Sequence, residues 1–496
     1  MEIKVVERLD SGHCSADLAV YLVLEGEASL TELDSELDFE FEIKPSMATA
    51  GKVTLLYGAH GSRHAALVGL GSADRLDAEV IRRVAGSASR AIVREGYRTV
   101  AVFLDKPSVE QMPEATVQAW AEGWLLGGYT FDKYKMNPRQ PTLEHLLLVC
   151  GSGNAEELAH SVSRSVLRAE SAMLARDWCN EPANVMTPER LVEQTELLFA
   201  GRPNVGLKIY RGDELRQHEM NGLLAVGQGS RHQPALVEVT YSSNPALPMI
   251  ALIGKGMTFD MGGMNVKTGR DLSEARFDMG GACAVIGAMD YLIRSEASVN
   301  VVLLIAVADN VPGAGALLPS SIIRYPNGMT VQVGNTDAEG RLILADALLH
   351  ARRLGASEMI DIATLTGSVG HALGLRVAGV WGDARCTEAL RSIGEHNGER
   401  VWPMPLVDED EELLRSEYAD VNNISSSAYG GAVAAALFLR KFAGNSARWA
   451  HIDMANTVQA SADRGYEMAG ATGFGVRLLV DYVLQTQASQ DNANLR

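Results

Sequence analysis

The chain has 496 residues, of which 47% are hydrophobic and 21% are charged, and its formal net charge is −18. The composition is typical of a globular protein with a large core, and the length favours two to three domains. The negative charge argues against nucleic acid or an anionic membrane as a main partner, and no apolar run reaches the roughly 18 residues of a membrane span.

The first part of the chain alternates between strand-like and helix-like segments. Residues 1–6 are typical of a first strand and not of a signal peptide. Residues 77–95 carry apolar residues at helical spacing, and further strands are expected at 65–70, 100–104 and 146–149. We therefore expect an N-terminal α/β domain over residues 1–154.

A segment without glycine or proline follows this domain. Residues 155–178 lack both and have a helical pattern, so we expect a linking helix over residues 155–180. Pro182 lies just beyond it, and proline cannot continue a helix. We expect the C-terminal domain, which carries the chemistry described below, to cover residues 181–496.

The C-terminal domain repeats the alternation of strands and helices. Its expected strands are at 250–253, 299–308, 330–333, 359–363, 377–381 and 450–454, and its clearest helices are at 282–294 and 342–353. Several of these strands are almost continuously apolar, which predicts a mostly parallel central sheet flanked by helices. Ligands of such sheets bind beyond the carboxyl ends of the strands.

The five cysteines, at positions 14, 150, 179, 283 and 386, show no paired spacing. Their odd number and wide separation predict a reducing, cytoplasmic environment without a disulfide framework. We interpret them as small buried hydrophobic residues.

Two acids and a guanidinium lie close together in the octet Asn-Thr-Asp-Ala-Glu-Gly-Arg-Leu at residues 335–342. In an extended segment, the spacing of Asp337 and Glu339 would place both carboxylates on one face. Arg341 follows a glycine, which would let the backbone turn sharply. Because charged residues are rarely buried unless they are paired or bind a metal, the octet predicts a cation site.

A second polar motif, at residues 254–263, follows the first expected strand of the C-terminal domain. It contains Lys255 and Asp260, and Lys267 and Asp278 follow it. With the octet, four carboxylates would come together and repel one another, whereas two divalent cations would neutralise them. Oxygen ligands suit Mn²⁺, Mg²⁺ or Zn²⁺, and the absence of nearby cysteines argues against a structural zinc site. A buried ion-pair network without metal is disfavoured by its desolvation cost.

These motifs resemble those of the leucyl (cytosol) aminopeptidase family of two-metal metallopeptidases. The octet matches the family signature without a change, and the motif around Lys255 matches except at Met261, where the family usually has a serine. Further matches lie at 180–188, 227–230 and 361–367. The resemblance covers roughly residues 180–480, whereas the first 150 residues agree only in their α/β pattern.

The resemblance implies a metal-dependent aminopeptidase that hydrolyses N-terminal amino acids from peptides through a water activated by two metal ions. It implies Lys267 as the electrophile that faces the scissile carbonyl, and Arg341 as the holder of a bicarbonate ion that acts as general base. It also implies a homohexamer. The implied ligands of the two ions, Mn²⁺ or Zn²⁺ with Mg²⁺ as an alternative, are Lys255, Asp260, Asp278, Asp337 and Glu339, of which Asp260 and Glu339 would bridge both ions.

Two departures from the family pattern concern the pocket for the first side chain of the substrate. Ala275 stands where the family often has a methionine and could widen that pocket, while Met261 could narrow it. Two other functional interpretations stay open: a non-catalytic homologue with a binding or structural role, including DNA binding, and a two-metal phosphoesterase. The complete set of implied site residues favours an enzyme, and the lack of a phosphate-binding loop disfavours the phosphoesterase.

Overall fold

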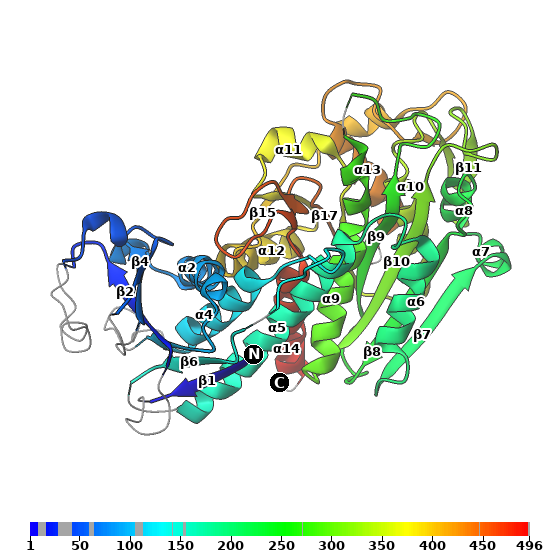
Figure 1. Cartoon of the computed structure of the whole chain (residues 1–496). Helices are drawn as coiled ribbons and strands as arrows, with labels where there is room; N and C mark the ends of the chain where they lie inside the picture. The colour runs from blue at the N-terminus through cyan, green and yellow to red at the C-terminus, as the bar shows by residue number, and fades with distance from the viewer. Residues whose placement is uncertain are drawn as a thin grey trace. The chain divides into compact units, whose positions relative to one another are not determined.

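The computed structural model describes residues 1–7, 16–27, 42–58, 64–104, 113–140, 142–151, 155–269, 271–445 and 447–494. The chain forms two compact units (Figure 1). Unit 1 comprises Met1–Met173 and Ala460–Ala469, and unit 2 comprises Leu174–Gln459 and Gly470–Arg496. Cys14 lies outside the described residues.

Unit 1 is built around a six-stranded sheet with strand order β1-β6-β5-β2-β4-β3. All neighbouring strands are parallel except β3 and β4. Helix α2 (Ala78–Ile92) packs on α4 (Pro113–Gly128), and the Asp77 side chain caps α2 by accepting a hydrogen bond from the Val80 amide. The strands are β1 (Glu2–Val6), β2 (Leu18–Leu24), β3 (Val53–Leu56), β4 (His64–Gly71), β5 (Thr99–Phe103) and β6 (His145–Val149).

A segment from near the C-terminus belongs to unit 1. Within residues 460–469, the Tyr466 hydroxyl donates to Glu79 Oε1 at 3.0 Å, and Glu467 O accepts from the Arg90 guanidinium at 2.8 Å. Gly86 of α2 allows the close approach, because a Cβ there would lie 2.5 Å from the Tyr466 Cα. The segment therefore packs on α2 through hydrogen bonds and close backbone contact.

Helix α5 (Ala155–Asn180) is continuous and ends just before Pro182. Its residues up to Met173 belong to unit 1, and its residues from Leu174 onward belong to unit 2. The absence of glycine and proline from its sequence is consistent with an unbroken helix.

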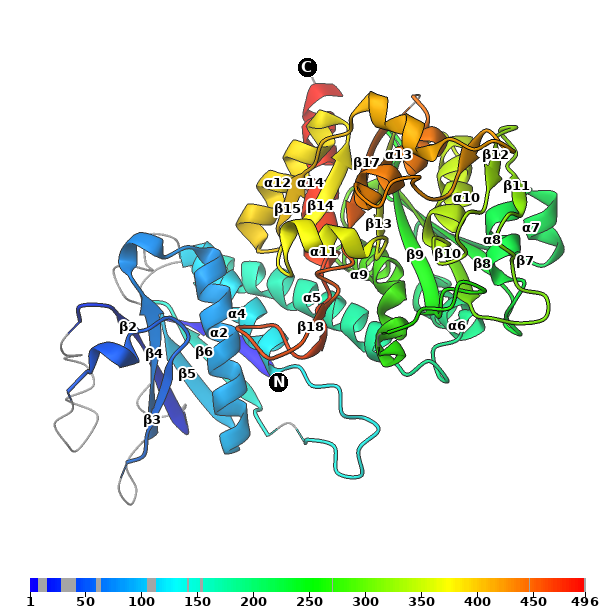
Figure 2. The same cartoon turned by 90° about the horizontal axis from the view of Figure 1, so that it is seen from above.

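Unit 2 is built around an eight-stranded sheet with order β15-β14-β17-β13-β9-β10-β8-β7, which runs from left to right in Figure 2. Its four central strands, β17, β13, β9 and β10, are parallel. This confirms the predicted mostly parallel centre. The strands are β7 (Val205–Arg211), β8 (Ala235–Ser242), β9 (Ile250–Asp260), β10 (Asn300–Asn310), β13 (Glu358–Ala363), β14 (Ala378–Gly382), β15 (Val401–Pro403) and β17 (Arg448–Asp453).

Helices cover both faces of the central strands. Ile253 of β9 belongs to a core shared with α10 (Gly340–Arg353) and α13 (Gly431–Ala443). Gly254, the next residue, lies against α9 (Gly280–Arg294), and α9 in turn packs on α14 (Val476–Asn494). Further helices of unit 2 are α6 (Pro188–Phe199), α7 (Asp213–Gln217), α8 (Asn221–Gly227), α11 (Gly367–Leu373) and α12 (Ala384–Asn397).

Two expected strands differ from the structure. The strand expected at 250–253 continues to Asp260, so the Lys255 motif lies within a strand and not after it. The segment expected at 330–333 forms β12 (Thr330–Gln332) in a separate sheet with β11 (Ile322–Arg324) and β16 (Val421–Asn422). Among the described residues, no helix combines the length and apolar character needed to cross a membrane.

Candidate metal centre

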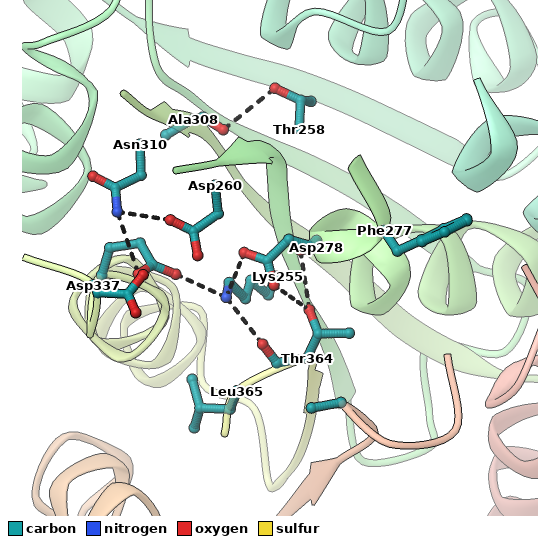
Figure 3. Close-up of polar contacts among 12 residues, drawn as sticks. Lys255, Thr258, Asp260, Phe277, Asp278, Ala308, Asn310, Asp337, Thr364 and Leu365 are labelled. Carbon is teal, nitrogen blue, oxygen red and sulfur yellow. Dashed lines mark hydrogen bonds and ion pairs between the residues drawn. The ribbon is translucent and has the colours of Figure 1, made fainter. Parts of the chain in front are cut away.

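A β-bulge brings the two polar side chains of β9 to one face of the sheet. Lys255 and Asp260 are five residues apart, and in a regular strand an odd separation would direct them to opposite faces. The pairing of β9 with β10 contains a register shift that leaves Thr258 as an extra residue. The Thr258 hydroxyl donates to the Asp309 carboxylate, which holds the bulge. In Figure 3, Lys255 and Asp260 point into the same site.

The octet forms a turn and the start of a helix, and not the expected extended segment. The Asn335 side chain accepts a hydrogen bond from the Asp337 amide at 2.7 Å, a local bond that favours turns. Glu339 is the N-cap residue of α10, with φ −75° and ψ −36°. Gly340 begins the helix and serves close packing, because a Cβ there would lie 2.7 Å from Lys255 Cε. The sharp turn expected at this glycine is therefore not its role.

Three carboxylates converge at this point. Asp260, Asp337 and Glu339 each offer an oxygen atom, and these atoms lie within 4.8 Å of one another. Asp260 and Glu339 are buried and Asp337 is half-buried. Burial raises the pKa of Asp337 and of Glu339, and the nearby charge of Asp260 raises both further. Such a set of crowded oxygen donors fits a divalent cation.

Lys255 joins these carboxylates to Asp278. Its Nζ lies 2.7 Å from Asp278 Oδ2 and 2.8 Å from Glu339 Oε1, and it donates to the Thr364 carbonyl at 3.0 Å. The side chain is only 2% exposed. Burial alone would lower the pKa of Lys255, but the surrounding carboxylates outweigh burial and raise it. The contacts with Asp278 and Glu339 thus favour the charged form of Lys255.

Asp278 reaches the site from the short helix Leu272–Met279, directly before α9. The Thr364 hydroxyl donates to its Oδ1 at 2.7 Å. Burial raises the pKa of Asp278 to about 8, although the charge of Lys255 opposes this shift. Asp278 lies beside the three-carboxylate group and contacts it through Lys255 (Figure 3).

Lys267 and Arg341 supply two further positive charges. Lys267 Nζ lies 2.5 Å from Asp260 Oδ2 and also contacts Asp337. Arg341 is buried and donates through Nη1 to the Asn423 carbonyl at 2.8 Å. Burial lowers the pKa of Arg341 to about 10. Among the described residues, the buried Arg341 Nε has no hydrogen-bond partner, so it can donate to an anion.

Six of the seven predicted site residues form one cluster of ion pairs and converging carboxylates, whereas Arg341 donates to the Asn423 carbonyl. The structure also adds residues that sequence reasoning missed. Asn310, the last residue of β10, donates to Asp260 at 2.8 Å. Asp453, the last residue of β17, accepts from the Leu365 amide and the Thr366 hydroxyl. Both lie at the carboxyl ends of parallel strands, where ligand sites of such sheets occur, and this position was the signal that could have identified them.

The two departures from the family pattern occupy different surroundings. Met261 follows Asp260, and its carbonyl accepts a hydrogen bond from the Lys267 amide at 2.9 Å. Its backbone thus helps to orient the segment that carries Lys267. Ala275 is buried in the short helix that carries Asp278.

Comparisons with known proteins extend over both units. Residues 173–480 match the catalytic domain of the cytosol aminopeptidase family, and residues 27–138 match the N-terminal domain of the same family. The second match reaches the part of the chain in which sequence analysis found only a shared α/β pattern.

Individual relatives are similar over most of their length. The chain is 38% identical to the probable cytosol aminopeptidase of Geobacter sulfurreducens, over 88% of each chain. It is 35% identical to that of Persephonella marina, over 94% of this chain and 92% of the relative. The solved structure of the bottromycin maturation enzyme BotP has a TM-score of 0.83 at 31% identity and covers 96% of this chain and 100% of BotP. A complex of BotP with Mn has a TM-score of 0.84 at 30% identity, over 95% of this chain and 100% of BotP.

Proposed function

Because this chain belongs to the cytosol aminopeptidase family, and is thus a hydrolase of the aminopeptidase class, we propose that it releases N-terminal amino acids from peptides at a centre of two divalent metal ions. The observation that carries this proposal is the convergence of Asp260, Asp337 and Glu339, with oxygen atoms within 4.8 Å of one another. The family match favours this function over a phosphoesterase and over a non-catalytic homologue.

The proposed ligands divide between two ions, Mn²⁺ or Zn²⁺, with Mg²⁺ as a further candidate. Asp260 and Glu339 would bind both ions, Asp337 would bind one, and Lys255 with Asp278 would bind the other. Lys255 can be a ligand only as the neutral amine. This requires the positive charges of the two ions to neutralise the carboxylates in place of the charge of Lys255. When bound, the ions would supply a water of lowered pKa and a Lewis acid for the scissile carbonyl.

Lys267 would act on the scissile carbonyl of the substrate, and Arg341 would act on the removal of a proton from the attacking water. Lys267 would donate to the carbonyl oxygen, where negative charge develops, and Asp260 and Asp337 hold its ammonium group in place. Arg341 would hold a bicarbonate ion through its free Nε, by a charge-assisted hydrogen bond. A bicarbonate ion held by Arg341 would supply the general base of the reaction. The acidic surroundings also favour a free α-amino group over a blocked one.

We further propose a cytoplasmic location and a homohexamer. The names of the relatives support the location, as do Cys179, Cys283 and Cys386, which form no disulfide among the described residues. The homohexamer is what the resemblance to the family implies.

The proposed function is tested by assaying the unmodified protein and an Asp337→Ala variant in parallel. The substrates are aminoacyl-4-nitroanilides and dipeptides, each with added Mn²⁺, Zn²⁺ or Mg²⁺. We expect metal-dependent release of the N-terminal residue and a loss of kcat/KM in the variant of roughly a hundredfold or more. Asp213→Ala is the matched control, because Asp213 is an exposed acid on α7 that pairs only with Arg216 among the described contacts. Robust turnover by Asp337→Ala would contradict the proposal.

A further inference from the structure

We propose that Asn310 is a positioning residue that fixes the orientation of the two carboxylates expected to bridge the metal ions, Asp260 and Glu339. The inference rests on the proposed function, because it concerns the same centre. Asn310 itself is not a metal ligand in this account. It acts on the reaction only through the two carboxylates.

One amide group of Asn310 contacts both acids. Its Nδ2 donates to Asp260 Oδ1 at 2.8 Å and to Glu339 Oε2 at 3.4 Å. Nδ2 also donates to the Thr336 carbonyl at 3.0 Å. The residue is only 4% exposed. An amide NH₂ has two hydrogens and can only donate, so the short bonds to Asp260 and Thr336 are the main ones and Glu339 shares a hydrogen with one of them. Each carboxylate still turns a lone pair toward Nδ2.

The second oxygen of each carboxylate faces an ammonium group. Asp260 Oδ2 lies 2.5 Å from Lys267 Nζ, and Glu339 Oε1 lies 2.8 Å from Lys255 Nζ. Each carboxylate is thus held at one oxygen by Asn310 and turned toward a positive charge at the other. A carboxylate restrained in this way cannot rotate freely, so its plane is set before a cation binds.

The fold determines both the place and the orientation of the Asn310 amide. The bulge at Thr258 sets Asn310 directly opposite Asp260 in the parallel pairing of β10 and β9. The Asn310 carbonyl accepts from the Met261 amide at 2.9 Å. On the other side, Gly263 leaves space for the amide, because a Cβ there would lie 2.5 Å from Asn310 Oδ1. Figure 3 shows the side chain directed at Asp260 and at the octet.

A neutral donor suits this position better than other residues of similar size. An aspartate would add another negative charge to three crowded carboxylates. A leucine would fill the space without donating a hydrogen bond, so Asp260 would keep only the Gly262 amide and Lys267 as partners, and Glu339 would lose one of its two restraints. Partners that orient metal ligands typically contribute 10- to 100-fold to metal affinity or activity, and we expect an effect of roughly this size here.

The experiment measures Mn²⁺ binding by isothermal titration calorimetry, and kcat and KM, on the full chain after removal of metals. The variants are Asn310→Leu and Asn310→Ala. Both remove the amide donor, so Asn310→Ala tests the proposal if Asn310→Leu does not fold. Asn300→Leu is the matched control, because Asn300 is a buried amide on the same strand that donates to the Leu247 carbonyl, away from the acidic cluster. Thermal melting of all proteins reports the structural effect separately.

We expect both Asn310 variants to bind Mn²⁺ about 10- to 100-fold more weakly and to lose kcat with little change in KM at saturating Mn²⁺. Asn300→Leu should lower the melting temperature but keep the Mn²⁺ affinity. The proposal is overturned if the Asn310 variants bind Mn²⁺ like the unmodified protein, or if Asn300→Leu loses as much affinity as they do. An unmodified protein that neither binds Mn²⁺ nor cleaves peptides would instead overturn the proposed function.

Discussion

Lys267 competes with any metal ion for the same carboxylate oxygens. Its ammonium contacts Asp260 and Asp337, which are two of the proposed metal ligands. Burial alone would lower the pKa of Lys267, but the charges of Asp260 and Glu339 raise it. The lysine is therefore charged near neutral pH, and a cation that binds here must displace it or share its partners.

This competition separates the role of Lys267 from that of the ligands. In a Lys267→Ala variant we expect kcat to fall by roughly 10²- to 10³-fold, because a donor to the developing oxyanion is lost. The affinity for Mn²⁺ should stay the same or increase, since a competing positive charge is removed. Titration calorimetry with Mn²⁺ and steady-state kinetics on the same preparation check both expectations. A parallel loss of metal affinity would show that Lys267 serves the metal site itself.

The sequence motifs identified charged side chains that come together at the site, but not the hydrogen bonds that orient them. Asp337 and Glu339 were predicted from the octet, and the structure brings both to the acidic cluster. Asn310 was missed because an asparagine at the end of an apolar run carries no charge pattern. Its contact with Asp260 depends on pairing between strands that are 50 residues apart in sequence.

At the scale of elements, the main error concerned the end of β9. Gly254, Lys255 and Gly256 have the composition of a loop, so the strand was expected to end at residue 253. It continues because β10 pairs with β9 as far as Asp260, whereas the pairing with β13 ends at Gly254. The bulge at Thr258 could not be predicted, since it depends on how β9 and β10 are aligned.

Helix α9 must approach the sheet closely, because Asp278 lies two residues before its first residue, Gly280. A Cβ at Gly281 would lie 2.1 Å from the Ile362 carbonyl oxygen of β13. We expect Gly281→Ala to destabilise the protein, because overpacking against a backbone atom costs about 1–3 kcal/mol while the gain in helix propensity is about 1 kcal/mol. The result should be a lower melting temperature and weaker Mn²⁺ binding as Asp278 shifts.

The control for this change is Gly367→Ala, at the first position of α11. Apart from its chain neighbours, no atom of the described residues lies within 4 Å of a Cβ built at Gly367, so the melting temperature of this variant should stay the same or rise slightly. Differential scanning fluorimetry compares the two variants. Equal melting temperatures for Gly281→Ala and the unmodified protein would contradict the packing argument.

At the scale of the whole molecule, the sequence predicted the α/β class of both parts from alternating patterns. It could not predict that residues 460–469 join unit 1, because the contact of Tyr466 with Glu79 spans 387 positions of the chain. No local pattern encodes such a pairing. The N-terminal family match likewise required comparison with whole families rather than a short motif.

The proposed assembly gives a direct prediction of native mass. A hexamer of 53.3 kDa chains has a mass of six times 53.3 kDa, about 320 kDa. Size-exclusion chromatography with light scattering should give this value at micromolar concentration. A mass near 53.3 kDa that does not change with concentration would exclude the hexamer.

The measurement that tests the account most directly is the anomalous diffraction of crystals soaked in Mn²⁺, recorded on both sides of the manganese absorption edge. A two-metal centre should give two peaks, both in contact with Asp260 and Glu339, with Asp337 beside one and Lys255 and Asp278 beside the other. A single peak, or peaks away from these five residues, would contradict a two-metal centre.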